Sequence, residues 1–104
     1  MQISLDKLMV SQWNLNRVDQ IKGIIDSIKN GEYVDPINVS ELGDDIFRIE
    51  DGNHRAVAYF LSGRLSLNYG EFNIVPFNAS RNTVGLLKDL VAELLSKGKY
   101  ENKG

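Results

Sequence analysis

The feature that most constrains the fold of this chain is a glycine between two apolar segments of different periodicity. The alternating run at residues 46–49 predicts a strand, and the apolar run Ala56–Leu61 predicts a helix. Gly52 separates the two segments, so the chain is expected to turn there. A helix that starts after such a turn has backbone N–H groups without intrahelical acceptors, and its dipole favours negative charge at that end. Because the helix is apolar on nearly every side, the sequence predicts an anion-binding turn at the start of a buried helix.

Side chains around this turn strengthen the anion-binding prediction. Asn53, His54 and Arg55 occupy the predicted first helical turn, and imidazole and guanidinium groups donate hydrogen bonds to phosphate oxygens. We expect His54 to be neutral near pH 7, because the helix dipole disfavours its protonated form. Glu50 and Asp51 could act as a general base or metal ligand, or could simply neutralise Arg55. In the last case the segment is only a tight turn with a helix cap.

The remaining chain predicts an α+β fold with a small mixed sheet and about three packed helices. Alternating segments predict strands at residues 2–5, 37–40, 46–49 and 72–77. Pro76 favours an edge position, or the end of the strand, for the last of these. The expected starts and ends of the helices are Asn16 and Gly31, Gly52 and Gly63 (with Ser62 as the last helical residue), and Asn82 or Thr83 and Gly98. The apolar stripe of the last helix is expected to run from Val84 to Leu95.

Composition limits the classes of function. The length predicts a single domain over residues 1–98 with a frayed polar tail at 99–104. A net charge of −2 gives no general basic surface for nucleic acid. The chain has no cysteine and one histidine, which excludes disulfides and thiolate catalysis and predicts no zinc or iron site. No apolar run approaches the length of about 18 residues that spans a bilayer, and no signal-peptide pattern is present, so a cytoplasmic location without a membrane partner is expected.

Two features have both a structural and a functional interpretation. Trp13 lies in a predicted loop at residues 11–16, where it either closes an edge of the core or offers a stacking surface for a base. Asp44 and Asp45 could bind a metal, but the tip of a hairpin turn explains them more simply.

Three segments together resemble the N-terminal domain of the ParB/sulfiredoxin-like superfamily. They are Ile28–Gly31, Asp35–Val39 and Arg48–Ala58. The resemblance covers about residues 3–85, but its specific part is the turn from Gly52 and the spacing of that turn from Pro36. It implies a small fold in which Gly52, His54 and Arg55 hold nucleotide phosphates. The turn is also similar to the Asp-Gly-Gln-His-Arg turn of proteins associated with DNA modification systems, and to that of free-serine kinases, which use an upstream Glu as base.

Two departures limit what the resemblance implies. Asn53 occupies the position of the catalytic Cys of sulfiredoxin-like members, so sulfinic-acid reduction is excluded because no thiolate is present. ParB proteins carry a Glu there, so the resemblance does not by itself imply their metal-assisted nucleotide chemistry. ParB proteins also have a Glu-Asn-x-x-Arg box, to which this chain is similar except that Phe77 replaces the acid. Asn78 and Arg81 are therefore implied as phosphate or metal-water contacts.

Three functions are compatible with these patterns. The first is a module that binds a nucleotide or the phosphate of DNA, with ATP or CTP and Mg²⁺ as candidate cofactors and with added charge from Arg48. The second is a Mg²⁺-dependent phosphotransferase, NTPase or nuclease in which Glu50 or Asp51 is the base or metal ligand, while His54 and Arg55 stabilise the phosphoryl group. The third is a module that docks on a protein partner and carries a vestigial motif. Binding ranks first because the second acidic box is absent.

Overall fold

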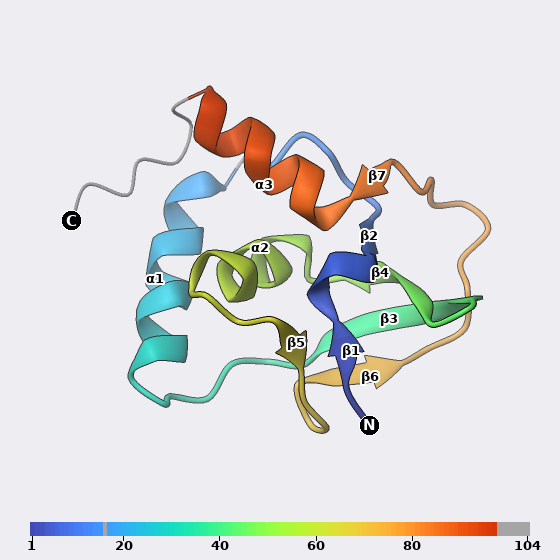
Figure 1. The fold of residues 1–104 in the computed structure, drawn as a ribbon, viewed down its shortest axis with the longest axis horizontal. Helices are drawn as coiled ribbons and strands as arrows, with labels where there is room; N and C mark the ends of the chain where they lie inside the picture. Colours follow the sequence, from blue (N-terminus) through green and yellow to red (C-terminus); the bar gives the residue numbers. More distant parts are fainter. Residues whose placement is uncertain (16, 98–104) are drawn as a thin grey trace.

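The computed structural model describes residues 1–15 and 17–97 of the chain. In chain order its elements are β1 (Ile3–Ser4), the 3₁₀ helix η1 (Leu5–Lys7), β2 (Leu8–Val10), α1 (Val18–Lys29), β3 (Ile37–Gly43), β4 (Ile46–Asp51), α2 (Asn53–Leu61), β5 (Ser66–Leu67), β6 (Phe72–Ile74), β7 (Gly85–Leu86) and α3 (Leu87–Ser96) (Figure 1). Three α-helices and a mixed sheet make this an α+β fold, which confirms the expected fold class.

Five strands form the main sheet in the order β6-β3-β4-β2-β7. The pairs β3–β4 and β2–β7 are antiparallel, whereas β2–β4 and β3–β6 are parallel. A second, two-stranded sheet pairs β1 with β5. The central strand is β4, and both of its faces are buried: Phe47 and Ile49 join the hydrophobic core, while Arg48 and Glu50 alternate with them and point to the opposite face.

The hairpin between β3 and β4 follows the expected turn chemistry. Asp44 and Asp45 have φ angles of 54° and 61°, and the flanking residues Gly43 and Ile46 pair across the turn. Two consecutive residues with positive φ are typical of the two-residue turns whose twist matches that of antiparallel strands. The interpretation of the acidic pair as a turn tip is confirmed.

Helix α2 is the centre of the helical layer and lies between α1 and α3 (Figure 1). Ala56, Val57 and Ala58 are fully buried in it. Small residues on successive positions let neighbouring elements approach α2 from several sides, which a helix with one polar face does not allow. The prediction of a buried second helix is confirmed.

The predicted start of the third helix is wrong. Residues 85–86 pair with β2 as β7, and α3 begins only at Leu87. Neither Asn82 nor Thr83 is the cap, because the residue that precedes α3 is Leu86 and no side chain caps the helix; the Thr83 hydroxyl instead accepts a hydrogen bond from Arg48 at 3.3 Å. Val84 and Leu95, which were expected in the apolar stripe, are 40% and 48% exposed. Pairing with β2 therefore makes residues 85–86 a strand, although their apolar spacing fits a helix.

The other boundary errors concern very short strands. The strand expected at 2–5 ends at Ser4 because η1 follows, and β2 and β5 were not predicted. Strands of two or three residues are too short to produce a recognisable alternation. The strand expected at 72–77 ends at Ile74, before Pro76, and lies at an edge of the sheet as predicted.

The remaining expected helix ends divide into two groups. Gly31 has a φ of +70° directly after Asn30, the C-cap of α1, and Gly63 has a φ of +90° directly after Ser62, the C-cap of α2, as expected for glycines that end helices. Asn16, Gly98 and the tail at 99–104 lie outside the described residues. Among the described helices, none combines the length and apolarity required to cross a membrane.

Candidate phosphate-binding site

Gly52 makes the transition from the central strand to the central helix. It has a φ of +108°, between the end of β4 at Asp51 and the start of α2 at Asn53. A Cβ at this position would lie 3.1 Å from Nη2 of Arg55 and 3.2 Å from Cγ1 of Ile37. Glycine is therefore required by the backbone conformation and favoured by the close approach of these two side chains.

The start of α2 offers unpaired hydrogen-bond donors. The first intrahelical bond runs from the N–H of Ala56 to the carbonyl of Gly52, at 2.9 Å. The N–H groups of Asn53, His54 and Arg55 have no acceptor among the described residues, and no side chain caps the helix. Such donors, together with the positive end of the helix dipole, favour a bound anion.

A pocket of about 450 Å³ opens beside this turn. It is lined by Gln12, Gln20, Ile24, Ser27, Tyr33, Val34, Asp35, Asp51, Gly52, Asn53, His54, Arg55 and Arg81. The structure thus brings six of the predicted site residues to one pocket, while Glu50 and Asn78 do not line it. The pocket-lining residues Gln12, Gln20 and Ser27 were missed, because no local sequence signal connects the loop after β2 and helix α1 with the Gly52 turn.

Arg55 is held at the edge of the pocket by two backbone carbonyls and one exposed carboxylate. Its Nη1 donates to the carbonyls of Asp35 and Pro36 at 3.1 and 3.0 Å, and its Nη2 lies 3.3 Å from Oδ2 of Asp51. The Arg55 side chain is 21% exposed and that of Asp51 is 68% exposed. An ion pair this exposed contributes little to stability, so a ligand phosphate can compete for the guanidinium.

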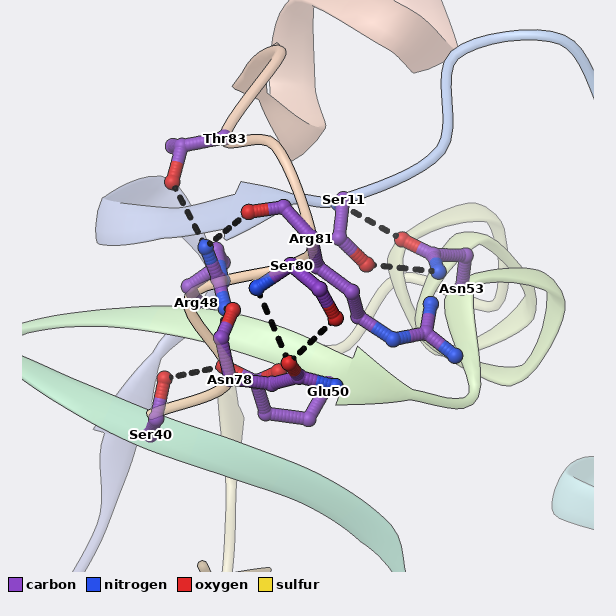
Figure 2. Close-up of polar contacts among 9 residues, drawn as sticks. All are labelled: Ser11, Ser40, Arg48, Glu50, Asn53, Asn78, Ser80, Arg81 and Thr83. Carbon is purple, nitrogen blue, oxygen red and sulfur yellow. Dashed lines mark hydrogen bonds and ion pairs between the residues drawn. The ribbon is translucent and has the colours of Figure 1, made fainter. Parts of the chain in front are cut away.

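The Asn53 side chain is hydrogen-bonded inside the protein, whereas the His54 side chain is half-buried beside the pocket. The Asn53 amide accepts from the Ser11 N–H at 3.1 Å and lies 3.3 Å from the Ser11 hydroxyl, so it ties the end of β2 to the start of α2 (Figure 2). Burial lowers the pKa of His54, and the nearby Arg17 lowers it further. The neutral form was expected from the helix dipole, whereas desolvation is the main cause here. The Nε2 atom of His54 is buried without a partner among the described residues.

Glu50 belongs to a buried ion pair on the other face of β4. Its Oε2 accepts from Nη2 and Nε of Arg48 at 2.6 and 3.0 Å and from the Ser40 hydroxyl at 2.5 Å (Figure 2). Burial alone would raise the pKa of Glu50, but the bonds from Ser40 and Arg48 lower it below its ordinary value. Arg48 was expected to add charge to the phosphate site, but it is fully buried. Its charge is neutralised by Glu50 instead.

Asn78 and Arg81 lie in the segment that covers this ion pair. The Asn78 side chain accepts from the N–H and hydroxyl of Ser80 at 3.0 and 2.6 Å, so it stabilises its own turn. The Arg81 side chain is directed toward Asn53 and the pocket, while its carbonyl faces Arg48 (Figure 2). Of this pair of sequence candidates, Arg81 alone has its side chain at the pocket.

Trp13 has a structural position. Its Nε1 donates to Oε2 of Glu93 at 2.7 Å, and its ring packs so closely on Gly85 that a Cβ there would lie 2.7 Å from Cζ3. It is partly buried against the core and does not line the pocket. The interpretation of Trp13 as an edge of the core agrees with these contacts.

The part of the chain that the structure describes has no group of three His, Cys, Asp or Glu side chains that could hold a metal ion.

Comparison of the chain with protein-family models gave no match, and comparison with curated proteins found no significant similarity.

Proposed function

We propose that this chain is a ParB/sulfiredoxin-like module that binds a nucleotide, or the phosphate of a nucleic acid, at the Gly52–Arg55 turn. One observation carries the proposal: the unpaired N–H groups that begin α2 adjoin the pocket that Arg55 and Arg81 also line. Backbone donors and two guanidinium groups converging on one hollow suit a phosphate group, which accepts several charge-assisted hydrogen bonds.

The rest of the pocket suits the nucleoside part of a nucleotide. Ile24 and Val34 provide apolar surface, the Tyr33 ring provides a stacking surface, and the amides of Gln12 and Gln20 provide hydrogen bonds. A volume of about 450 Å³ is in the range of small-molecule sites. The net charge of −2 argues against a long nucleic-acid interface, so a mononucleotide such as ATP or CTP is the first ligand to test.

A titration tests this proposal directly. ATP, CTP, pyrophosphate and a short DNA duplex are each titrated by calorimetry, with and without Mg²⁺, into the wild type and into Arg55→Ala, Arg81→Ala and Lys88→Ala. Lys88 is exposed and does not line the pocket, so its variant controls for the general loss of positive charge. Loss of one charge-assisted hydrogen bond predicts an affinity about tenfold lower for each pocket arginine variant. The proposal fails if no probe binds at millimolar concentration, or if all three variants bind as the wild type does.

A Mg²⁺-dependent phosphotransferase or nuclease is the second candidate, and Asp51 is the observation that favours it. This carboxylate lines the pocket and is largely exposed, whereas Glu50 is committed to Arg48. Asp51 and Asp35 could accept hydrogen bonds from water on a Mg²⁺ ion that arrives with the nucleotide. Turnover of nucleotide or DNA that disappears in Asp51→Asn would favour the enzyme over the binding module.

Two further expectations belong to the proposal. A cytoplasmic location is consistent with a nucleotide ligand, and fractionation of the cells that express the chain tests it. Docking on a protein partner would be indicated by a partner complex that Arg55→Ala leaves unchanged.

A further inference from the structure

The segment between β6 and β7 presents Arg81 to the pocket, although it has almost no regular structure of its own. Its ends are fixed by hydrogen bonds from the Val75 N–H to the Val39 carbonyl, at 2.7 Å, and from the Val84 N–H to the Val10 carbonyl, at 3.0 Å. Between these ends the backbone hydrogen bonds of the described residues are either internal to the segment or made to Arg48.

We propose that Arg48 is a positioning residue, which fixes the position of Arg81 at the pocket by hydrogen bonds to the backbone of this segment. Its Nη2 donates to the Asn78 carbonyl at 2.8 Å and its Nη1 to the Arg81 carbonyl at 3.0 Å (Figure 2). Nη1 also lies 3.3 Å from the Thr83 hydroxyl, and the guanidinium lies 4.0 Å from the centre of the Phe77 ring. One planar group thus touches the segment at four residues.

The shape of the guanidinium explains why an arginine stands here. Two N–H groups, on Nε and Nη2, donate to Glu50, while further N–H groups on Nη1 and Nη2 reach two carbonyls three residues apart. A lysine ammonium is a single point and cannot bridge these acceptors in the same way. The pair with Glu50 keeps the charge of a fully buried side chain neutralised.

Stability alone is a poor explanation for this arrangement. A buried ion pair is often no more stabilising than apolar side chains of the same volume, because both charges lose their hydration. What apolar side chains cannot provide is a directional bond to the carbonyl of Arg81 itself. The side chain of Arg81 extends from this residue toward the pocket. The bond to the carbonyl therefore fixes the backbone position from which the Arg81 side chain reaches the pocket (Figure 2).

This inference rests on the proposed function, since it concerns the affinity of the same pocket, and a double-mutant cycle tests it. ATP, or pyrophosphate if ATP does not bind, is titrated into the wild type, Arg48→Lys, Arg81→Ala and the double variant. Arg48→Lys is expected to lower affinity about tenfold in the wild type but less than about twofold in the Arg81→Ala background, because Arg48 acts through Arg81. Equal losses in the two backgrounds would overturn the inference, because Arg48 would then act on the fold as a whole.

Hydrogen exchange provides a readout that does not depend on ligand. Amides of residues 78–83 are expected to exchange faster in Arg48→Lys, while the amides of α1 and α2 keep their protection. If Arg48→Lys does not fold, the neutral variant Arg48→Met/Glu50→Gln replaces it, since it leaves no unpaired buried charge. Unchanged exchange at 78–83 in a folded variant would overturn the inference. If the wild type binds no probe, the proposed function fails, yet the exchange measurement still decides whether Arg48 holds the segment.

Discussion

Two arginine–carboxylate pairs flank the Gly52 turn, and they differ in their access to solvent. The pair Arg48–Glu50 is within β4, with a distance of 2.6 Å and side chains that are 1% and 7% exposed. The pair Arg55–Asp51 crosses the turn, with a distance of 3.3 Å and side chains that are 21% and 68% exposed. The two pairs have the same chemistry, but burial makes the first a fixed part of the fold and leaves the second available to a ligand. The predictions below test this difference.

The largest expected effect is on the buried pair. Arg48→Met leaves the Glu50 carboxylate buried without its partner, which predicts a loss of about 3–5 kcal/mol in the free energy of unfolding. Arg55→Met breaks the exposed pair and also removes the hydrogen bonds to the carbonyls of Asp35 and Pro36, which predicts a smaller loss of about 1–3 kcal/mol. Urea denaturation followed by circular dichroism measures both. Addition of Glu50→Gln to Arg48→Met is expected to recover part of the loss, and similar losses in the two single variants would contradict the comparison.

Gly52 lies between the two pairs, and its replacement is expected to have the next largest effect. Gly52→Ala forces a side chain into a φ of +108° and against Arg55 and Ile37, which predicts a loss of about 1–2 kcal/mol or more. Gly63→Ala is the matched control, because Gly63 has a φ of +90° but open space around it. Denaturation of both variants separates strain from contact. A loss in Gly63→Ala as large as in Gly52→Ala would show that the contacts with Arg55 and Ile37 cost nothing.

Asp51→Asn tests the exposed pair with a smaller expected effect. The free energy of unfolding is expected to change by less than about 0.5 kcal/mol, as for other exposed ion pairs. Release of Arg55 predicts an affinity for pyrophosphate that is about twofold to fivefold higher at low salt. Calorimetry of the variant against the wild type measures this. Weaker binding in the presence of Mg²⁺ would instead indicate that Asp51 serves the ligand, as the second candidate function requires.

The pH dependence of stability gives the smallest expected effect. Burial lowers the pKa of His54 below its ordinary 6.5, so the unfolded chain takes up a proton first as the pH falls. The free energy of unfolding therefore has its full value with respect to His54 above pH 6.5, and it decreases as the pH falls below 6.5. Glu50 also has a lowered pKa, so its contribution is complete above 4.5 and decreases at lower pH. The free energy of unfolding of the wild type and of His54→Gln is measured by urea denaturation between pH 8 and 5. The slopes of this free energy against pH are expected to differ between the two proteins only below about pH 6.5.

The parts of the fold that the sequence predicted are those with local causes. The hairpin at Asp44–Asp45, the glycine ends of the helices and the buried character of α2 each depend on residues close in sequence. The short strands β2, β5 and β7 depend on partners far along the chain, such as Leu86 opposite Met9. No local pattern identifies such strands, and the helix expected from Thr83 was displaced for the same reason.

The candidate site divides in the same way. Asp51 to Arg55 were predicted to lie together because they are consecutive, and all of them line the pocket. Arg81 was identified only through a resemblance to a family box, and nothing in the local sequence indicates that it reaches the same pocket. Gln12 and Gln20 were not predicted, because they come from the loop and helix that pack beside the turn.

The sequence by itself determined where the chain must turn and which helix is buried, since glycine conformation and apolar spacing act over a few residues. Tertiary structure alone decided what each arginine does. Arg48 is buried in an ion pair with Glu50, whereas Arg55 lies beside the exposed Asp51. Arg81 lines the pocket because its segment is hydrogen-bonded to Arg48. The reason is that the effect of a charge depends on its partners and its access to water, and both are set by residues that are distant in the sequence.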